Sequence, residues 1–344
     1  MGQGCCLLRL MLIDVTLDDF GEELHPPFPC LEELLFDVPG CGGILDSPLL
    51  LMQVTRFKCG GLLLAWRWNH TMADGIGFYQ FMTAVAELAR GDQLSAQPIW
   101  ERHILCARDP PRVTCVHHEY DNVPETNGTI VPFDDVIHRS FFFGPGEMSA
   151  LKRLIPPNLK PSTTFEVLTA CLWQCRTIAL QPDPNEKVRF HCIMNARSRL
   201  NPRIPYGYYG NAVAFSPVLT TAGDLCQKSV GYALELVRKA KANVNDEYIR
   251  SLADFLVING RPPLTATSLC FAVSNITRIG FDVLDFGWGL PIFAGSAGEL
   301  PGIGTFYAPY KNKKGEMGIL FPISLPASAM GRFVTELNSM LDES

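Results

Sequence analysis

The first part of the chain shows the alternating apolar pattern of β-strands. Leu49 to Arg56 and Leu62 to Trp68 are two mainly apolar runs, and the residues between them, Lys58 to Gly61, include two glycines. This pattern predicts a hairpin or a close pair of strands. An earlier run, Leu8 to Val15, is apolar at near-alternating positions and predicts a further strand. The stretch Leu17 to Gly43 is rich in proline, glycine and acidic residues, so we expect it to be a surface connection.

The periodicity changes from strand to helix soon after Trp68. Apolar residues recur at helical spacing from Ile76 to Ala89, and Arg90-Gly91 marks the end of that run. The segment Asn69 to Gly75 is therefore expected to be a tight turn between a strand and a helix.

The second half of the chain mixes both periodicities. Strands are expected at Ser140–Phe143, Val188–Met194, Ala212–Phe215 and Phe271–Val273. Helices are expected from the capping pair Thr163 and Glu166 to a residue before Pro182, and at Asp224–Ala242, Asn245–Ile258 and Pro326–Leu341. These elements predict an α/β fold with mixed sheets. We expect an N-terminal domain at 1–104, a proline-containing crossover linker at 105–139 and a C-terminal domain at 140–344.

Composition narrows the range of partners. The 344 residues are 47% hydrophobic, and a net charge of −6 is spread without long runs of one sign. We therefore expect no nucleic-acid partner and no membrane partner. Twelve cysteines are scattered without a Cys-x-x-Cys pair, which favours free thiols and a cytoplasmic location. The cluster from Cys115 to Glu119 could be taken as a metal site, but we interpret it as a polar interdomain loop and expect no metal.

His70 and Asp74 are the leading candidates for chemistry. They lie four residues apart on the predicted turn, where a strand delivers a histidine and an aspartate directly precedes a helix. A histidine fixed in this way can act as a general base towards a bound hydroxyl. The same spacing recurs at His117 and Asp121, in the predicted linker, so spacing alone does not separate a base from an ordinary histidine. The position of Asp74 directly before a helix favours an N-cap role, which fixes the shape of the loop, over a role in proton transfer.

A second motif changes the interpretation. Asp285-Phe286-Gly287-Trp288-Gly289 follows the His70–Gly75 motif in the chain, and together they resemble the two signatures of the plant BAHD acyl-CoA-dependent acyltransferases. The resemblance extends to four further segments that span nearly the whole chain: Pro161–Glu166, Asn195–Arg199, Tyr208–Asn211 and Lys311–Gly315. Two signatures in the right order are far more specific than either alone.

The resemblance implies a two-domain fold similar to chloramphenicol acetyltransferase, with a catalytic channel. It implies that His70 removes the proton of an alcohol while the oxygen attacks the thioester of acyl-CoA, without an acyl-enzyme. Asp74 would give structural support by pairing with Arg197. Asp285, Gly287 and Gly289 would have structural roles. Trp288 would mainly pack, although its indole N–H could donate to the developing oxyanion.

Acyl-CoA is implied as a co-substrate, and no permanently bound cofactor is expected. Lys160, Ser162 and Thr163 match a CoA-contacting stretch of the family, and they precede a helix whose free amides favour anions. An ordinary capped helix explains Ser162 and Thr163 as well. The run from Gly231 to Pro262 most resembles the branch of benzyl alcohol O-benzoyltransferases and fruit alcohol acyltransferases. We therefore expect a monomeric enzyme that transfers benzoyl or short aliphatic groups to benzyl or aliphatic alcohols.

Departures from the family leave a second interpretation open. Chains of the family begin roughly a hundred residues earlier, so the N-terminal domain is expected to be incomplete. Leu290 also stands where a lysine commonly follows the second signature. The alternative is a catalytically silent, truncated family member that retains CoA binding or partner contacts.

Overall fold

The computed structural model describes residues 6–20, 24–38, 47–121, 135–262, 269–298 and 304–342. The chain divides into two compact units, and neither unit is continuous in sequence. Unit 1 comprises 1–100, 206–211 and 279–297, and unit 2 comprises 101–205, 212–278 and 298–344. The domain boundaries expected from the sequence stay a prediction, and residues 122–134 of the expected linker lie outside the described residues.

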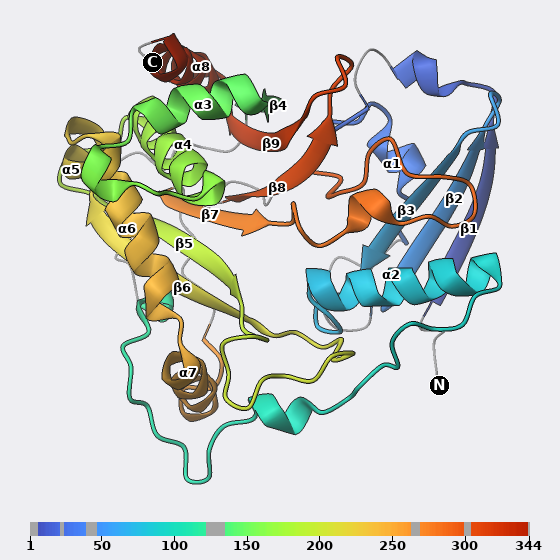
Figure 1. Cartoon of the computed structure of the whole chain (residues 1–344), viewed down its shortest axis with the longest axis horizontal. Coiled ribbons are helices and arrows are strands. Elements are labelled where there is room, and N and C mark those ends of the chain that lie inside the picture. Colours follow the sequence, from blue (N-terminus) through green and yellow to red (C-terminus); the bar gives the residue numbers. More distant parts are fainter. Residues whose placement is uncertain are drawn as a thin grey trace. The chain divides into compact units, whose positions relative to one another are not determined.

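Unit 1 is built on a three-stranded sheet in the order β1-β2-β3 (Figure 1). The strands are β1 (Cys6–Ile13), β2 (Leu50–Phe57) and β3 (Leu62–Trp68). Strands β2 and β3 form the predicted antiparallel hairpin, and β1 pairs parallel to β2. The expected surface connection contains the short helices η1 (Leu17–Phe20) and α1 (Leu31–Leu34).

The main helix of unit 1, α2 (Gly75–Arg90), confirms the helical spacing of the sequence. It packs on β3 through aromatic rings. The ring of Phe78 stacks on that of Trp68, with 3.9 Å between the ring centroids, and meets the ring of Trp66 edge-on, with 5.9 Å between the centroids. Gly91 ends the helix in the left-handed conformation, with φ of 81°. Aromatic packing thus fixes the helix that follows the candidate catalytic turn.

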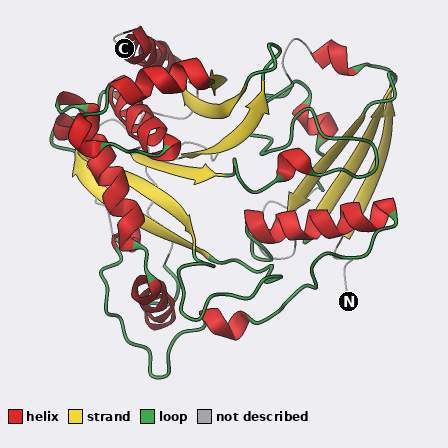
Figure 2. Ribbon diagram, viewed as in Figure 1, coloured by secondary structure: helices red, strands yellow, loops and turns green. Residues whose placement is uncertain are grey.

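Unit 2 contains a six-stranded mixed sheet in the order β4-β9-β8-β7-β5-β6. Figure 2 draws its strands in yellow. Its strands are β4 (Val136–Phe143), β5 (Lys187–Asn195), β6 (Val213–Thr221), β7 (Cys270–Asn275), β8 (Gly304–Lys311) and β9 (Met317–Pro326). Strand β5 is antiparallel to β6 and parallel to β7, and β7 is parallel to β8. Antiparallel pairs β8–β9 and β4–β9 complete the sheet.

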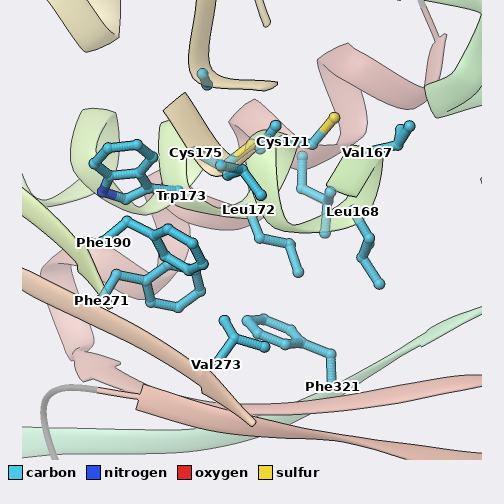
Figure 3. Packing of buried hydrophobic residues seen from close by; sticks show 14 of the residues in the cluster. Val167, Leu168, Cys171, Leu172, Trp173, Cys175, Phe190, Phe271, Val273 and Phe321 are labelled. Atoms are coloured by element: carbon cyan, nitrogen blue, oxygen red, sulfur yellow. The ribbon is translucent and has the colours of Figure 1, made fainter. Parts of the chain in front are cut away.

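Helix α4 (Thr164–Leu180) lies at the centre of the core of unit 2. Its residues from Glu166 to Thr177 are all buried, so it is covered on every side. Figure 3 shows Leu172 and Trp173 of α4 near Phe190, Phe271, Val273 and Phe321 from the sheet. Burial raises the pKa of the Cys171 thiol in this core to about 12. Cys171 is therefore a packing residue and not a nucleophile.

The other described α-helices of unit 2 are α3 (Pro145–Arg153), α5 (Ala222–Gln227), α6 (Val230–Asn243), α7 (Asp246–Ile258) and α8 (Ala327–Asp342). Four of them, namely α3, α5, α6 and α8, pack against α4. Unit 2 also contains the short 3-10 helices η2 (Arg102–Leu105), η3 (His118–Tyr120) and η5 (Pro157–Leu159). The 3-10 helix η6 (Phe281–Val283) belongs to unit 1.

The structure corrects one predicted helix. The expected single helix at Asp224–Ala242 is two helices, α5 and α6, which break at Lys228 and Ser229. Ser229 has extended backbone angles and stands at the N-cap of α6, where serine is a favoured residue. The capping residue interrupts a periodicity that is otherwise continuous.

The structure also corrects the expected environment of His117, which is buried although its segment was expected to be a polar loop. His117 is only 4% exposed, in a segment that packs against α7. Its Nδ1 lies 3.0 Å from Glu119 Oε1, and its Nε2 lies 3.0 Å from Ser251 Oγ. The Ser251 hydroxyl also accepts the backbone N–H groups of Thr114 and Cys115. The segment lacks periodicity because hydrogen bonds to α7, rather than an apolar face, hold it in place.

Candidate active site

His70 lies on the turn between β3 and α2, as the sequence predicts, and its side chain is exposed. The side chain of Asn69, the first residue of the turn, stabilises the turn. Its Oδ1 accepts hydrogen bonds from the backbone N–H of Thr71 at 3.1 Å and from the Thr71 hydroxyl at 2.7 Å. The backbone N–H of Asn69 also donates to the carbonyl of Leu49, the residue before β2, at 2.8 Å. His70 is thereby presented to solvent from a fixed loop.

Asp74 forms the other end of the turn and caps α2. Its Oδ1 accepts the backbone N–H of Gly77 at 2.9 Å, and the residue is 2% exposed. Trp68 adds a further tie, since its indole N–H donates to the carbonyl of Ala73 at 3.1 Å. Asp74 therefore has the structural N-cap geometry that the sequence allowed.

One contact on the turn comes from a segment 141 residues further along the chain. The side-chain amide of Asn211 donates to the backbone carbonyl oxygen of His70 at 2.7 Å. Sequence reasoning singled out Tyr208–Asn211 only as a point of family resemblance. Periodicity carries no signal for such a contact, because a single side chain from a loop makes it.

The second signature lies in unit 1 and forms a compact turn. Asp285 Oδ1 accepts the backbone N–H groups of Gly287, Trp288 and Gly289, at 2.7, 3.0 and 2.9 Å. These backbone hydrogen bonds lower the pKa of the Asp285 carboxyl. Gly287 and Gly289 have φ values of 99° and 98°, which suit glycine.

This turn docks at the end of α2 that is opposite to His70. The Arg90 guanidinium, in the last turn of α2, donates to the Asp285 carbonyl. A helix of 16 residues is about 24 Å long. Trp288 is 65% exposed, and its ring lies beside that of Phe286. An oxyanion donor must lie within about 3 Å of the reacting oxygen, so this placement favours a structural role for the motif.

The predicted CoA-contacting residues lie together in unit 2, at the start of α4. Thr163 is the N-cap, and its hydroxyl accepts the backbone N–H of Glu166 at 3.3 Å. The Ser162 hydroxyl donates to the carbonyl of Leu159 at 2.6 Å and accepts a hydrogen bond from Arg238 at 2.9 Å. Lys160 is exposed. The two hydroxyls thus help to fold the turn, and Lys160 supplies an exposed cation beside it.

Arg197 follows β5 in unit 2. Its backbone N–H donates to Asn195 Oδ1 at 3.1 Å, so a side-chain turn also ends this strand. The predicted pairing of Arg197 with Asp74 stays a prediction. Within the described ranges, no group of three or more histidine, cysteine, aspartate or glutamate side chains is arranged to hold a metal ion. In the same residues, no helix combines the length and apolar character needed to cross a membrane.

Comparison with known proteins defines the class. Residues 12–340 match the model of the Transferase family, so the chain belongs to this family and the predicted BAHD resemblance is confirmed. It is an acyltransferase. The chain is 59% identical over 333 residues to a benzyl alcohol O-benzoyltransferase of Petunia hybrida, covering 95% of this chain and 72% of the relative. It is 50% identical over 348 residues to alcohol acyl transferase 1 (allele GSa) of Malus domestica, and this match covers 99% of this chain and 75% of the relative.

Solved structures support the predicted fold. Vinorine synthase superimposes with a TM-score of 0.70 at 18% identity, covering 96% of this chain and 75% of that one. TRI101 of F. graminearum, in complex with coenzyme A and deoxynivalenol, superimposes with a TM-score of 0.69 at 19% identity. The match covers 94% of this chain and 78% of that one. The expected two-domain α/β acyltransferase fold is therefore confirmed.

Proposed function

We propose that this acyltransferase transfers a benzoyl or short aliphatic acyl group from coenzyme A to benzyl or aliphatic alcohols, with His70 as the general base. The observation that carries the proposal is the position of His70, exposed on a turn that side-chain hydrogen bonds hold at both ends. The identity of 59% to a benzyl alcohol O-benzoyltransferase supports the choice of substrates.

The proposed reaction needs no covalent intermediate on the protein. His70 takes the hydroxyl proton as the alcohol oxygen forms a bond to the thioester carbonyl carbon. The carbon–sulfur bond of the tetrahedral intermediate then breaks, and the proton passes to the departing thiolate to give coenzyme A and the ester. A base held at the reacting oxygen contributes about 10²–10⁴ in rate. In this proposal Asp74 shapes the turn, with Arg197 as its partner, and Trp288 takes no part in the chemistry.

We propose that coenzyme A binds near Lys160, Ser162 and Thr163. Lys160 is an exposed cation suited to a phosphate, and the first amides of α4 favour an anion. Replacing Lys160 by alanine is expected to raise the KM for acyl-CoA several-fold. The rate with an N-acetylcysteamine thioester, which lacks the nucleotide, should stay unchanged. Lys152→Ala, at an exposed position on α3, is the matched control.

The reaction itself is tested with purified protein, benzoyl-CoA or acetyl-CoA and a panel of alcohols, with thiol release as the signal. We expect ester formation, and we expect His70→Ala to lower kcat by about 10²–10⁴ while coenzyme A still binds. His118→Ala, at another exposed histidine, should keep wild-type activity. Coenzyme A binding without ester formation would instead support a catalytically silent family member.

We also propose a cytoplasmic monomer. Cys171, Cys175 and Cys192 are buried thiols outside any disulfide, which is usual in a reducing compartment. Size-exclusion chromatography with light scattering tests the monomer, and localisation of a tagged chain tests the compartment.

A further inference from the structure

The segment Tyr206–Asn211 belongs to unit 1, although its neighbours on both sides in the chain belong to unit 2. The proposed reaction assigns it no task. It nevertheless contains Asn211, which contacts the turn that carries the proposed base. The question is whether the segment is held firmly enough for this contact to fix the base.

Two backbone contacts anchor the segment. The backbone N–H of Ile99 donates to the carbonyl of Gly207 at 3.0 Å, and Ile99 and Tyr208 form a parallel bridge. A β-carbon on Gly207 would stand 2.3 Å from the carbonyl oxygen of Gln97, so the two backbones touch where glycine alone allows it. Tyr208 is 2% exposed. The segment is therefore fixed before its last residue reaches the turn.

Asn211 then holds the backbone of His70 itself. Its Nδ2 lies 2.7 Å from the His70 carbonyl oxygen, which is a hydrogen bond of good length. Fixing this carbonyl fixes the peptide plane and the Cα from which the imidazole extends. Only the two side-chain torsions of His70 then remain to be set.

We propose that Asn211 is a positioning residue for His70. This inference rests on the proposed role of His70 as the base. A displacement of about 1 Å at a reacting group can cost on the order of 100-fold in rate. Loss of the hydrogen bond that holds the backbone of the base is therefore expected to lower kcat. Substrate binding draws on other residues, so KM is not expected to move with it.

The test uses the full chain with Asn211→Ala, which removes the donor, and Asn211→Asp, which replaces the donor by an oxygen facing the carbonyl oxygen. We expect kcat to fall about 10-fold to 100-fold, with the aspartate variant more affected. The KM for acyl-CoA and the thermal midpoint should stay close to wild type. The matched control is Asn259→Ala, because the exposed Asn259 of unit 2 also donates Nδ2 to a backbone carbonyl, that of Phe255.

A double substitution separates positioning from general structure. If Asn211 acts through His70, adding Asn211→Ala to His70→Ala should lower the remaining rate no further. An unchanged kcat in the single variants overturns the proposal. So does a rise in KM at constant kcat, or an equal loss with and without His70. Full activity of His70→Ala would instead remove the base assignment, so the two failures are distinguishable.

Discussion

The backbone carbonyl oxygen of Tyr209 lies 1.8 Å from the place where a β-carbon on Gly77 would stand. Gly77 is in the first turn of α2, so only a residue without a side chain lets the segment 206–211 approach the helix that follows His70. The obstacle is backbone, which cannot rotate away as a side chain can.

Gly77→Ala is therefore expected to push the segment and α2 apart. We expect a loss of about 1–3 kcal/mol in unfolding free energy from overpacking, together with a fall in kcat because Asn211 moves from His70. Thermal unfolding and initial rates measure both effects. Gly331→Ala, on the exposed side of α8 with no neighbouring atom within 4 Å of the added carbon, is the control. It should stabilise the protein by about 0.5–1 kcal/mol.

Asp74 provides a second prediction, because the structure gives its carboxylate a capping role. Asparagine caps a helix about as well as aspartate, whereas alanine does not. We expect stability to decrease in the order wild type, Asp74→Asn, Asp74→Ala, with alanine losing roughly 1 kcal/mol or more. The asparagine variant loses the charge of a residue that is 2% exposed. Activity should fall in parallel with the thermal midpoint. An Asp74→Asn protein of normal stability but without activity would point to direct chemistry.

The candidate site was predictable where its signal is local in sequence. An apolar strand, a turn and a helical repeat identify the His70 loop, and the N-cap role of Asp74 follows from its place before α2. The contact of Asn211 with His70 was not predictable, because 141 residues separate them and the contact involves one amide.

The lack of a local signal also explains why the sequence pattern did not predict β8 and α3. Strand β8 (Gly304–Lys311) contains Pro309 and lysine at its end, and its buried positions do not alternate regularly, so its pattern is weak. Helix α3 is only 9 residues long and starts at Pro145, which removes much of the periodic signal. Pairing with β9 and packing of α3 on α4 supply what local sequence lacks.

His117 gives a prediction that separates stability from activity. Replacing His117 by alanine removes one hydrogen bond from each of two buried side chains, those of Ser251 and Glu119. Both groups keep other hydrogen bonds, Glu119 with Tyr248 and Ser251 with the backbone N–H groups of Thr114 and Cys115. We therefore expect a loss of about 1–3 kcal/mol in total. We expect His117→Ala to be clearly less stable in urea unfolding, with kcat per folded molecule near wild type. His118→Ala is the neighbouring control, since the side chain of His118 is exposed and contacts the exposed side chain of Asp121. A loss of kcat in a stable His117→Ala protein would contradict this separation.

Glu166 provides the prediction about pH. Burial acts to raise the pKa of its carboxyl, but hydrogen bonds from Lys241 and from the Thr163 backbone, with the charges of Lys241 and Arg238, bring the pKa below its ordinary value of 4.5. A carboxyl whose pKa is lower in the folded state stabilises the protein above the unfolded value. That contribution is lost as the pH falls through the folded value.

The measurement compares wild type with Glu166→Gln in urea unfolding between pH 7 and pH 3. Wild type should be more stable at pH 7. The difference should shrink as the pH falls below about 4.5 and through the lower pKa of the folded state, where the carboxyl of folded wild type also becomes neutral. Glu235→Gln, at an exposed position on the neighbouring helix α6, should follow wild type throughout. If the difference between wild type and Glu166→Gln is the same at pH 7 and pH 3, the ion pairs with α6 contribute nothing to stability. The effect of Glu166 would then come from its hydrogen bond at the start of α4 alone.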